Sequence, residues 1–280
     1  MIQVTDIGVR RGRKEIVKGL SCTVRPGQVS VIIGQNGAGK STLLHAVSGS
    51  LKPISGSILW DHVPMEQLNA RELAKRRAVL SQQPHIAFPV RVFELVEMGT
   101  YAAGAPLTKR KKASLVDHAL REVEMKAFQH RYFYTLSGGE QKRVWLAKCI
   151  AQINCCHWAD RNKYLFLDEP TAGLDLQQQQ NFIELVRRFV NRRHLGVLAV
   201  LHDLNLAAQF ADQILLLREG RLLYAGSPKD VLTPSVLREV MGIECIVQPH
   251  PVYDCPHITT LSGPVSEQGL QQTTSAYERP

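Results

Sequence analysis

Short apolar runs alternate with segments of helical periodicity along most of this chain. Residues 28–34, QVSVIIG, form an apolar, β-branched run that ends in a glycine, which predicts a buried strand. Residues 41–49 then carry apolar side chains at helical spacing, which predicts a helix that ends at Gly49. After an expected turn at 52–57, residues 58–61 predict another strand. Strands followed by helices are the repeating unit of α/β folds.

The pattern changes between about residues 90 and 155. Apolar residues recur there at helical spacing in 90–99, 112–125 and 139–153, and no strand-like run interrupts them. We therefore predict an inserted helical subdomain at about residues 89–159. Alternation then resumes, and the expected strands and helices are, in turn, 163–170, 176–193, 195–203, 204–211 and 212–226. This alternation indicates a mostly parallel sheet with helices on its faces.

A glycine-rich loop lies between the first buried strand and the first helix. Its glycines allow backbone N–H groups to turn inward around a phosphate, and the helix N-terminus adds partial positive charge. Lys40 is expected to reach the β- and γ-phosphates of a nucleotide, and the Ser41 hydroxyl to bind Mg²⁺. The predicted nucleotide-binding residues of this loop are Gly34, Gln35, Asn36, Gly37, Ala38, Gly39, Lys40, Ser41 and Thr42.

Two adjacent carboxylates end the strand expected at 163–170. Ligands collect at the carboxyl ends of strands in an open α/β sheet. We expect Asp168 to hold Mg²⁺ through water, and Glu169 to polarise the water that attacks the phosphate. The alternative is a pair of merely solvated charges, and the phosphate loop in the same chain argues against it.

Composition narrows this picture only slightly. The net charge of +9 fits a nucleotide ligand, an anionic membrane surface, nucleic acid or a plain solvated surface. We interpret the basic run at 109–112 as a solvated helix start. No apolar run is long enough to cross a bilayer, the first residues carry no signal core, and the six cysteines fit the reduced thiols of the cytoplasm. The polar, aperiodic segment 261–280 predicts a disordered tail.

A second glycine-rich stretch, LSGGEQKRV at 136–144, opens another predicted helix. Ser137, Gly138 and Gly139 are expected to bind phosphate at the N-terminus of that helix. A single chain has little reason to fold two such sites onto one phosphate group. Two chains placed head to tail would bring them together.

In this order, the motifs resemble those of the ATP-binding subunit of ABC transporters. GQNGAGKST is similar to the Walker A motif, LSGGE to the signature motif, and YLFLDEP to the Walker B motif. TAGLD at 171–175 resembles the D-loop, and His202 resembles the switch histidine. Gln82, or its neighbour Gln83, resembles the Q-loop glutamine.

The resemblance covers about residues 1–260, and it implies a fold. That fold is an α/β P-loop NTPase domain with a RecA-like, mostly parallel core at about 1–88 and 160–245. An antiparallel β portion at the N-terminus and the inserted α-helical subdomain complete it. The family's arrangement also implies a homodimer in which each ATP lies between the Walker A loop of one chain and the signature motif of the other.

The resemblance further implies residue roles. Glu169 would be the general base, and His202 would contact the γ-phosphate and couple it to Glu169. Gln82 would sense Mg²⁺ and the attacking water, and Asp175 would lie at the dimer seam. The family usually has an aromatic residue that stacks on adenine near the N-terminus, but this chain has arginines there. Arg11 is therefore the candidate for that contact, because an arginine plane can stack on a purine.

Partners and cargo also come from the resemblance. This chain would lie peripherally at the cytoplasmic face of the inner membrane. Transport would need two separate integral-membrane permease subunits docked on the region after Gln82, and indirectly a periplasmic or extracellular substrate-binding protein. Segments 201–226 and 231–243 resemble importers of iron chelates, heme and vitamin B12. Segments 152–163 and 247–258 resemble the heme subgroup, so heme is the favoured cargo and a ferric siderophore or vitamin B12 is the alternative.

Other function classes fit less well. A DNA-repair ATPase of this type would need a long coiled coil between its motifs, a translation ATPase would need two cassettes, and an exporter is often fused to membrane helices. We therefore expect no nucleic-acid partner. Cys155–His157 and Cys255–His257 invite a role as soft ligands for heme iron or another metal. We favour chance surface cysteines there, because no paired ligand spacing of a zinc site is present.

Overall fold

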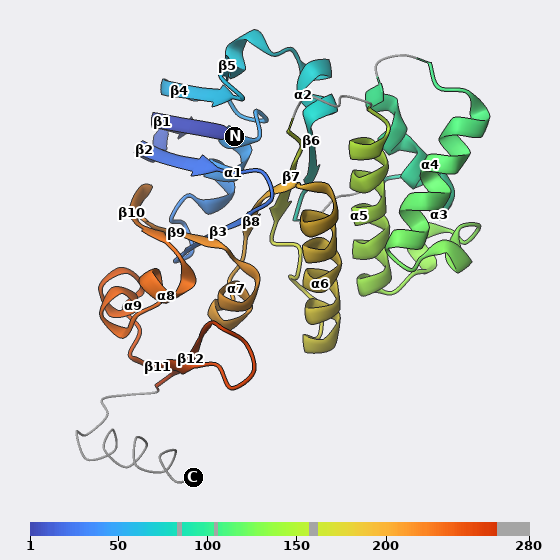
Figure 1. Ribbon diagram of the computed structural model, residues 1–280. Coiled ribbons are helices and arrows are strands. Elements are labelled where there is room, and N and C mark those ends of the chain that lie inside the picture. Colours follow the sequence, from blue (N-terminus) through green and yellow to red (C-terminus); the bar gives the residue numbers. More distant parts are fainter. Residues whose placement is uncertain (83–85, 104–105, 157–161, 262–280) are drawn as a thin grey trace.

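The central element of the structure is a six-stranded sheet, whose strands follow one another from β10 on the left to β6 on the right in Figure 1. The computed structural model describes residues 1–82, 86–103, 106–156 and 162–261. The strands lie in the order β10-β9-β3-β8-β7-β6, and all neighbours are parallel except β10 and β9. Their bounds are β3 Val29–Gly34, β6 Arg77–Leu80, β7 Tyr164–Asp168, β8 Gly196–Val200, β9 Gln213–Arg218 and β10 Arg221–Gly226. The predicted mostly parallel core is confirmed.

A second, antiparallel sheet comes from the N-terminal part of the chain. Its order is β2-β1-β4-β5, with β1 Ile2–Arg11, β2 Lys14–Val24, β4 Ser55–Trp60 and β5 Val63–Pro64. The turn expected at 52–57 is shorter than predicted, because β4 already begins at Ser55 to pair with Gly8 of β1. The expected strand at 58–61 ends at Trp60, since Asp61 has the left-handed φ of a turn. The antiparallel N-terminal portion is therefore confirmed.

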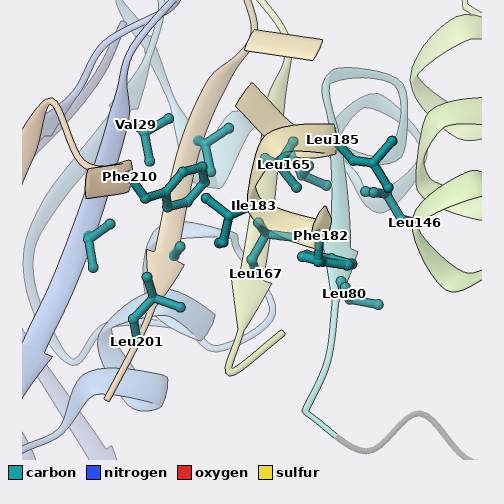
Figure 2. Close-up of a cluster of buried hydrophobic side chains, with 14 of the residues drawn as sticks. Val29, Leu80, Leu146, Leu165, Leu167, Phe182, Ile183, Leu185, Leu201 and Phe210 are labelled. Atoms are coloured by element: carbon teal, nitrogen blue, oxygen red, sulfur yellow. The ribbon is translucent and has the colours of Figure 1, made fainter. Parts of the chain in front are cut away.

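Alternate residues of the central strands face two separate hydrophobic cores, as the period of a strand requires. One face, with Ile32, Phe166 and Leu198, packs with the antiparallel sheet and with helix α1 (Lys40–Val47). The other face packs against α6 (Leu176–Arg193) and α7 (Leu204–Phe210). Figure 2 shows Phe182 and Ile183 of α6 and Phe210 of α7 among the strand residues of this second core.

Where the structure describes the segment between β6 and β7, it consists of three helices and short 3-10 turns, as the apolar spacing predicts. The helices are α3 (Val92–Glu97), α4 (Lys109–Glu122) and α5 (Gly138–Asn154). The expected helix at 90–99 changes to a 3-10 turn at Met98, where Gly99 lies too close to the backbone of α5 for any side chain: a Cβ there would be 2.3 Å from the carbonyl oxygen of Lys148. The helix expected at 112–125 ends at Glu122, and Glu124 adopts a positive φ. Lys109–Lys112 form the first turn of α4, as predicted.

The remaining elements are short. They are α2 (Ala70–Arg76), α8 (Pro228–Val231), α9 (Pro234–Met241), the hairpin β11 (Cys245–Pro249) and β12 (Pro256–Thr260), and the 3-10 turns η1 (Met65–Gln67), η2 (Met98–Ala103), η3 (Lys126–Phe128) and η4 (Phe133–Thr135). Among the described residues, no helix is long and apolar enough to cross a membrane. The tail predicted at 261–280 lies outside the described residues except for Leu261.

Trp60 joins the two sheets. Its fully buried ring lies edge-on to Tyr164, with centroids 5.1 Å apart, and beside Phe166 at 5.9 Å. Within the described part of the chain, the indole Nε1–H of Trp60 has no hydrogen-bond acceptor. The ring therefore stabilises the junction by burial, at the cost of one unpaired donor.

We expect Trp60→Ala to lower the free energy of unfolding by about 3–5 kcal/mol, because it leaves a large cavity between the sheets. Trp60→Phe should cost under about 2 kcal/mol, since losing the unpaired N–H recovers roughly 1–3 kcal/mol and offsets the smaller cavity. Urea denaturation followed by circular dichroism measures both changes. Equal destabilisation by the two substitutions would contradict this account of Trp60.

Candidate nucleotide-binding site

The loop between β3 and α1 curls around the ammonium group of Lys40. Lys40 Nζ donates hydrogen bonds to the carbonyl oxygens of Gly34, at 2.8 Å, and Gln35, at 3.0 Å. Gly37 and Gly39 have φ values of 81° and 99°, which favour glycine, so the backbone can make this tight curve. Burial lowers the pKa of Lys40, and the carboxylates of Glu169 and Asp168 oppose that effect. The residues predicted from the loop therefore do form one cradle at the start of α1.

Asp168, at the end of β7, lies beside this loop. Its Oδ1 accepts a hydrogen bond from the Ser41 hydroxyl at 2.8 Å, and its Oδ2 lies 3.4 Å from His45 Nε2. Burial raises the pKa of Asp168, but the hydrogen bonds from His45 and Ser41 outweigh burial and bring the pKa below its usual value. Hydroxyl and carboxylate oxygens side by side are the ligand type that Mg²⁺ prefers. The Ser41–Asp168 pair therefore fits a magnesium ion.

Glu169 lies between two side chains that sequence reasoning also selected. Its Oε1 is 2.6 Å from His202 Nε2, and its Oε2 accepts a hydrogen bond from the Gln82 amide. Glu169 has a φ of 49°, a conformation that few non-glycine residues adopt and that often marks a functional position. Gln82 makes this contact, whereas Gln83 lies outside the described residues.

Sequence reasoning missed His45 and Lys142. His45 follows Ser41 by one helical turn on α1, so the i, i+4 spacing could have placed it at Asp168. Lys142 of α5 donates a hydrogen bond from Nζ to the backbone carbonyl of Gln82 at 3.1 Å. Burial lowers the pKa of Lys142, and Glu169 opposes that effect, which places this cation within electrostatic range of Glu169. No sequence signal indicates that Lys142 would donate a hydrogen bond to the backbone carbonyl of Gln82.

The signature residues lie in a different place, at the N-terminus of α5. Ser137 is the N-cap: its Oγ accepts from the Glu140 N–H at 3.3 Å, and Glu140 Oε2 accepts from the Ser137 N–H at 2.8 Å. A groove of about 300 Å³ runs from here along α6 and η3, and no residue of the 34–42 loop lines it. Gly139 fits closely against Gln178, where a Cβ would meet the Gln178 amide at 2.7 Å. The two glycine-rich motifs of one chain therefore belong to separate surfaces.

Two further predicted residues have simple surroundings. Asp175 caps α6, because its Oδ1 accepts a hydrogen bond from the Gln178 N–H at 2.8 Å. Arg11 is exposed at the end of β1, and its charge contributes to the low pKa of Asp168 after the effects of burial, His45 and Ser41. Arg11 is therefore on the side of the molecule that holds the phosphate loop and the carboxylates.

Comparisons with known proteins identify the family of this chain. The family profile described as ABC transporter matches residues 17–172. Proteins named hemin import ATP-binding protein HmuV are among the relatives: the one from Rhizobium meliloti is 39% identical over 258 residues, which are 92% of this chain and 97% of the relative. The one from Gloeobacter violaceus is 39% identical over 275 residues, covering 97% of this chain and 98% of the relative.

Solved structures share the fold. A Clostridium perfringens protein, cbiO1, described as part of the ABC transporter complex cbiONQ, is 27% identical, with a TM-score of 0.73 over 85% of this chain and 92% of that one. A dimeric bacterial ABC transporter cassette is 23% identical, with a TM-score of 0.70 over 81% and 98% of the two chains.

This chain belongs to the ABC transporter family. It is an ATP-binding subunit of the kind that couples ATP hydrolysis to transport. The predicted fold class, the family and the ATPase activity are therefore confirmed.

Proposed function

We propose that this chain is the ATP-hydrolysing subunit of a hemin importer, and that it works as a homodimer at the cytoplasmic face of the membrane, beneath two separate permease subunits. The observation that carries the hydrolytic role is the Glu169 carboxylate, held between His202 and Gln82 beside the Lys40 loop. The observation that supports the cargo is the shared name of relatives that are about 40% identical over most of the chain. A ferric siderophore or vitamin B12 is the alternative cargo.

The phosphate loop is already shaped for a polyphosphate. The carbonyl oxygens that Lys40 contacts are weaker partners than phosphate oxygens, so Lys40 would exchange them for the β- and γ-phosphates of ATP. Thr42 and the backbone N–H groups of 34–42 would complete the cradle at the start of α1. When Mg²⁺ is bound, Ser41, Asp168 and Gln82 would hold it, and its charge would offset that of the phosphates.

Glu169 would act as the general base. His202 and Gln82 fix its two carboxylate oxygens from opposite neighbours, and each oxygen retains a lone pair for the proton of an attacking water. Gln82 and His202 follow β6 and β8, the two strands that flank β7. Their positions are therefore fixed by the sheet, and the two contacts fix the direction of the Glu169 carboxylate. Such fixing of a base is the condition for efficient proton transfer.

Lys142 would position this base from the signature helix. It holds the backbone of Gln82, and Gln82 in turn holds Glu169, so a displacement of α5 reaches the carboxylate through two hydrogen bonds. The signature end of the same helix would contact the ATP of the partner chain. Lys142 would therefore couple the closing of one nucleotide site to the geometry of the other.

The separation of the two glycine-rich motifs supports a head-to-tail dimer. Ser137 and Gly139 line the groove between α5 and α6. Together with Gly138, they would meet there the γ-phosphate of ATP bound by a second chain. Asp175, at the start of α6 beside that groove, would lie at the seam. The binding of two ATP molecules would close the dimer, and hydrolysis would open it.

Other partners follow from the same proposal. The region after Gln82 would dock the permease, and Phe88 in that region is 58% exposed. A periplasmic or extracellular substrate-binding protein would act indirectly through the permease. Arg11 would contact the adenine ring. We expect no nucleic-acid partner.

Hemin should stimulate ATP hydrolysis by the complex of this chain with its permease more than cobalamin or a ferric siderophore does. The measurement is phosphate release from the complex purified from membranes and reconstituted in vesicles with its binding protein.

Glu169→Gln should lower turnover by at least about 100-fold, the usual contribution of a general base. Glu184→Gln, on the exposed face of α6, is the matched control and should retain turnover. In the cargo experiment, stimulation by cobalamin but not by hemin would contradict hemin as the cargo, and the hydrolytic role of Glu169 would be unaffected.

Two inactive variants should restore activity when mixed. Lys40→Ala removes the phosphate-loop cation, and Ser137→Arg blocks the signature surface, so each homodimer has two defective sites. A mixed head-to-tail dimer has one site that combines an intact loop with an intact signature. We therefore expect phosphate release to appear after the variants are mixed and exchanged. Absence of activity in verified mixed dimers would show that each nucleotide site lies within one chain.

Lys142→Met should lower kcat by about tenfold, as expected for a charged hydrogen bond worth about 1.5 kcal/mol. The Kd for ATP should change less than twofold, because Lys142 contacts Gln82 and not the phosphate loop. Lys142→Arg should recover most of the rate. Lys148→Met is the control on the same helix, since Lys148 lies over the Trp145 ring. A loss of ATP affinity at unchanged kcat would contradict the positioning role.

A further inference from the structure

Two adjacent cysteines lie at the C-terminal end of α5, outside the nucleotide chemistry. The Sγ atoms of Cys155 and Cys156 are 3.5 Å apart, and both side chains are buried. Cys156 Sγ lies 3.4 Å from the carbonyl oxygen of Ala102, in η2. Apolar side chains of Leu115, Ala102, Ala103 and Leu107 surround the pair. Helix α5 separates this dithiol from Ser137 by its whole length, about 25 Å at the rise of an α-helix.

A lysine supplies positive charge to the cluster. Lys163 Nζ donates a hydrogen bond to the backbone carbonyl of Cys156 at 2.6 Å. The pKa of Cys156 is lowered to about 7, chiefly by the hydrogen bond from Cys155; burial opposes this, and the charges of Lys163 and Lys75 act in the same direction as the hydrogen bond. The pKa of Cys155 is raised, by its hydrogen bond with Cys156 and by burial.

The backbone disfavours a disulfide here. Adjacent Cα atoms lie about 3.8 Å apart across a trans peptide, below the roughly 4.4–6.8 Å that disulfides usually span. Cys155 retains helical dihedral angles, and its N–H is bonded to the carbonyl of Ala151 at 2.9 Å. A disulfide would have to break this helix end to bring the sulfurs to about 2.05 Å. A third atom that bonds both sulfurs requires no such closure.

The number and type of ligands at Cys155 and Cys156 also limit which atom could bond both sulfurs. Among the described residues, no group of three or more His, Cys, Asp and Glu side chains could hold a metal ion. Structural zinc sites take four ligands, whereas this pair supplies two sulfur atoms. Soft atoms with few ligands are better matched to two sulfurs.

We propose that Cys155 and Cys156 form a dithiol site that chelates trivalent arsenic through both sulfur atoms. Phenylarsine oxide is the matching probe, because its phenyl group fills one arsenic position and leaves two for sulfur. Its two arsenic–oxygen bonds break, two arsenic–sulfur bonds form, and the oxygen leaves with the two thiol protons as one water. Arsenic stays trivalent, so the step needs no oxidant or reductant. The apolar neighbours of the pair are the surface that the phenyl ring would contact.

Intact-mass spectrometry of the full chain, treated in its native state, tests this site. We expect one phenylarsenic adduct per chain that excess 2-mercaptoethanol leaves in place and dithiothreitol removes, because only a second dithiol can replace a chelate. Cys155→Ala and Cys156→Ala should each lose the resistant adduct. Cys245→Ser and Cys255→Ser are the controls and should retain it, since these thiols lie at opposite ends of the β11–β12 hairpin.

Three results would overturn the proposal. The first is a resistant adduct in the Cys155→Ala, Cys156→Ala double variant. The second is removal of the wild-type adduct by the monothiol. The third is an adduct that forms only after denaturation, with circular dichroism used to confirm the fold during labelling and with six reduced thiols counted beforehand.

Discussion

The parallel pairing of β6, β7 and β8 is the constraint on which the site depends. Leu80 pairs with Leu167, and Leu167 with Ala199, so the ends of the three strands are level. Gln82, Glu169 and His202 follow these ends within a few residues and meet at one edge of the sheet. A slip of one residue in either pairing would turn the buried side chains of a strand to the other face. The packing of both cores therefore fixes the register, and the register fixes the contacts of Glu169.

Helix α5 connects the signature residues at its N-terminus with the sheet that carries Glu169. Leu146 packs in the core between the sheet and α6, which anchors the helix to the strands that carry Glu169 (Figure 2). Its first residues form the signature cap, its second turn carries Lys142, and its end carries Cys155. Because these groups share one packed helix, a movement at the signature end is transmitted to the backbone of Gln82 by a rigid element and one hydrogen bond.

Much of the architecture follows from local sequence signals. Buried strands such as β3 and β7 have apolar runs that end at a glycine or a carboxylate, and α6 has a strong helical period, so their positions were predictable. The strand β6 and the β11–β12 hairpin were not predicted, because they are short and exist through pairing with distant segments. Lys142 and His45 were missed for a related reason. A long polar side chain finds its partner only after tertiary packing has placed both, whereas the phosphate loop is encoded within nine consecutive residues.

The two glycine-rich motifs differ in what they offer an anion. In the loop before α1, Lys40 provides a positive charge that donates hydrogen bonds to the carbonyl oxygens of Gly34 and Gln35. At the start of α5, the Glu140 carboxylate already occupies the N-terminus through its bond to the Ser137 N–H, and it would repel an approaching phosphate. Taken alone, the signature end would therefore bind an anion weakly. In the proposed dimer it would gain affinity when another surface holds the phosphate in place, because the entropy of association has then been lost already. This asymmetry favours a site in which the loop binds ATP first and the signature of a second chain completes it.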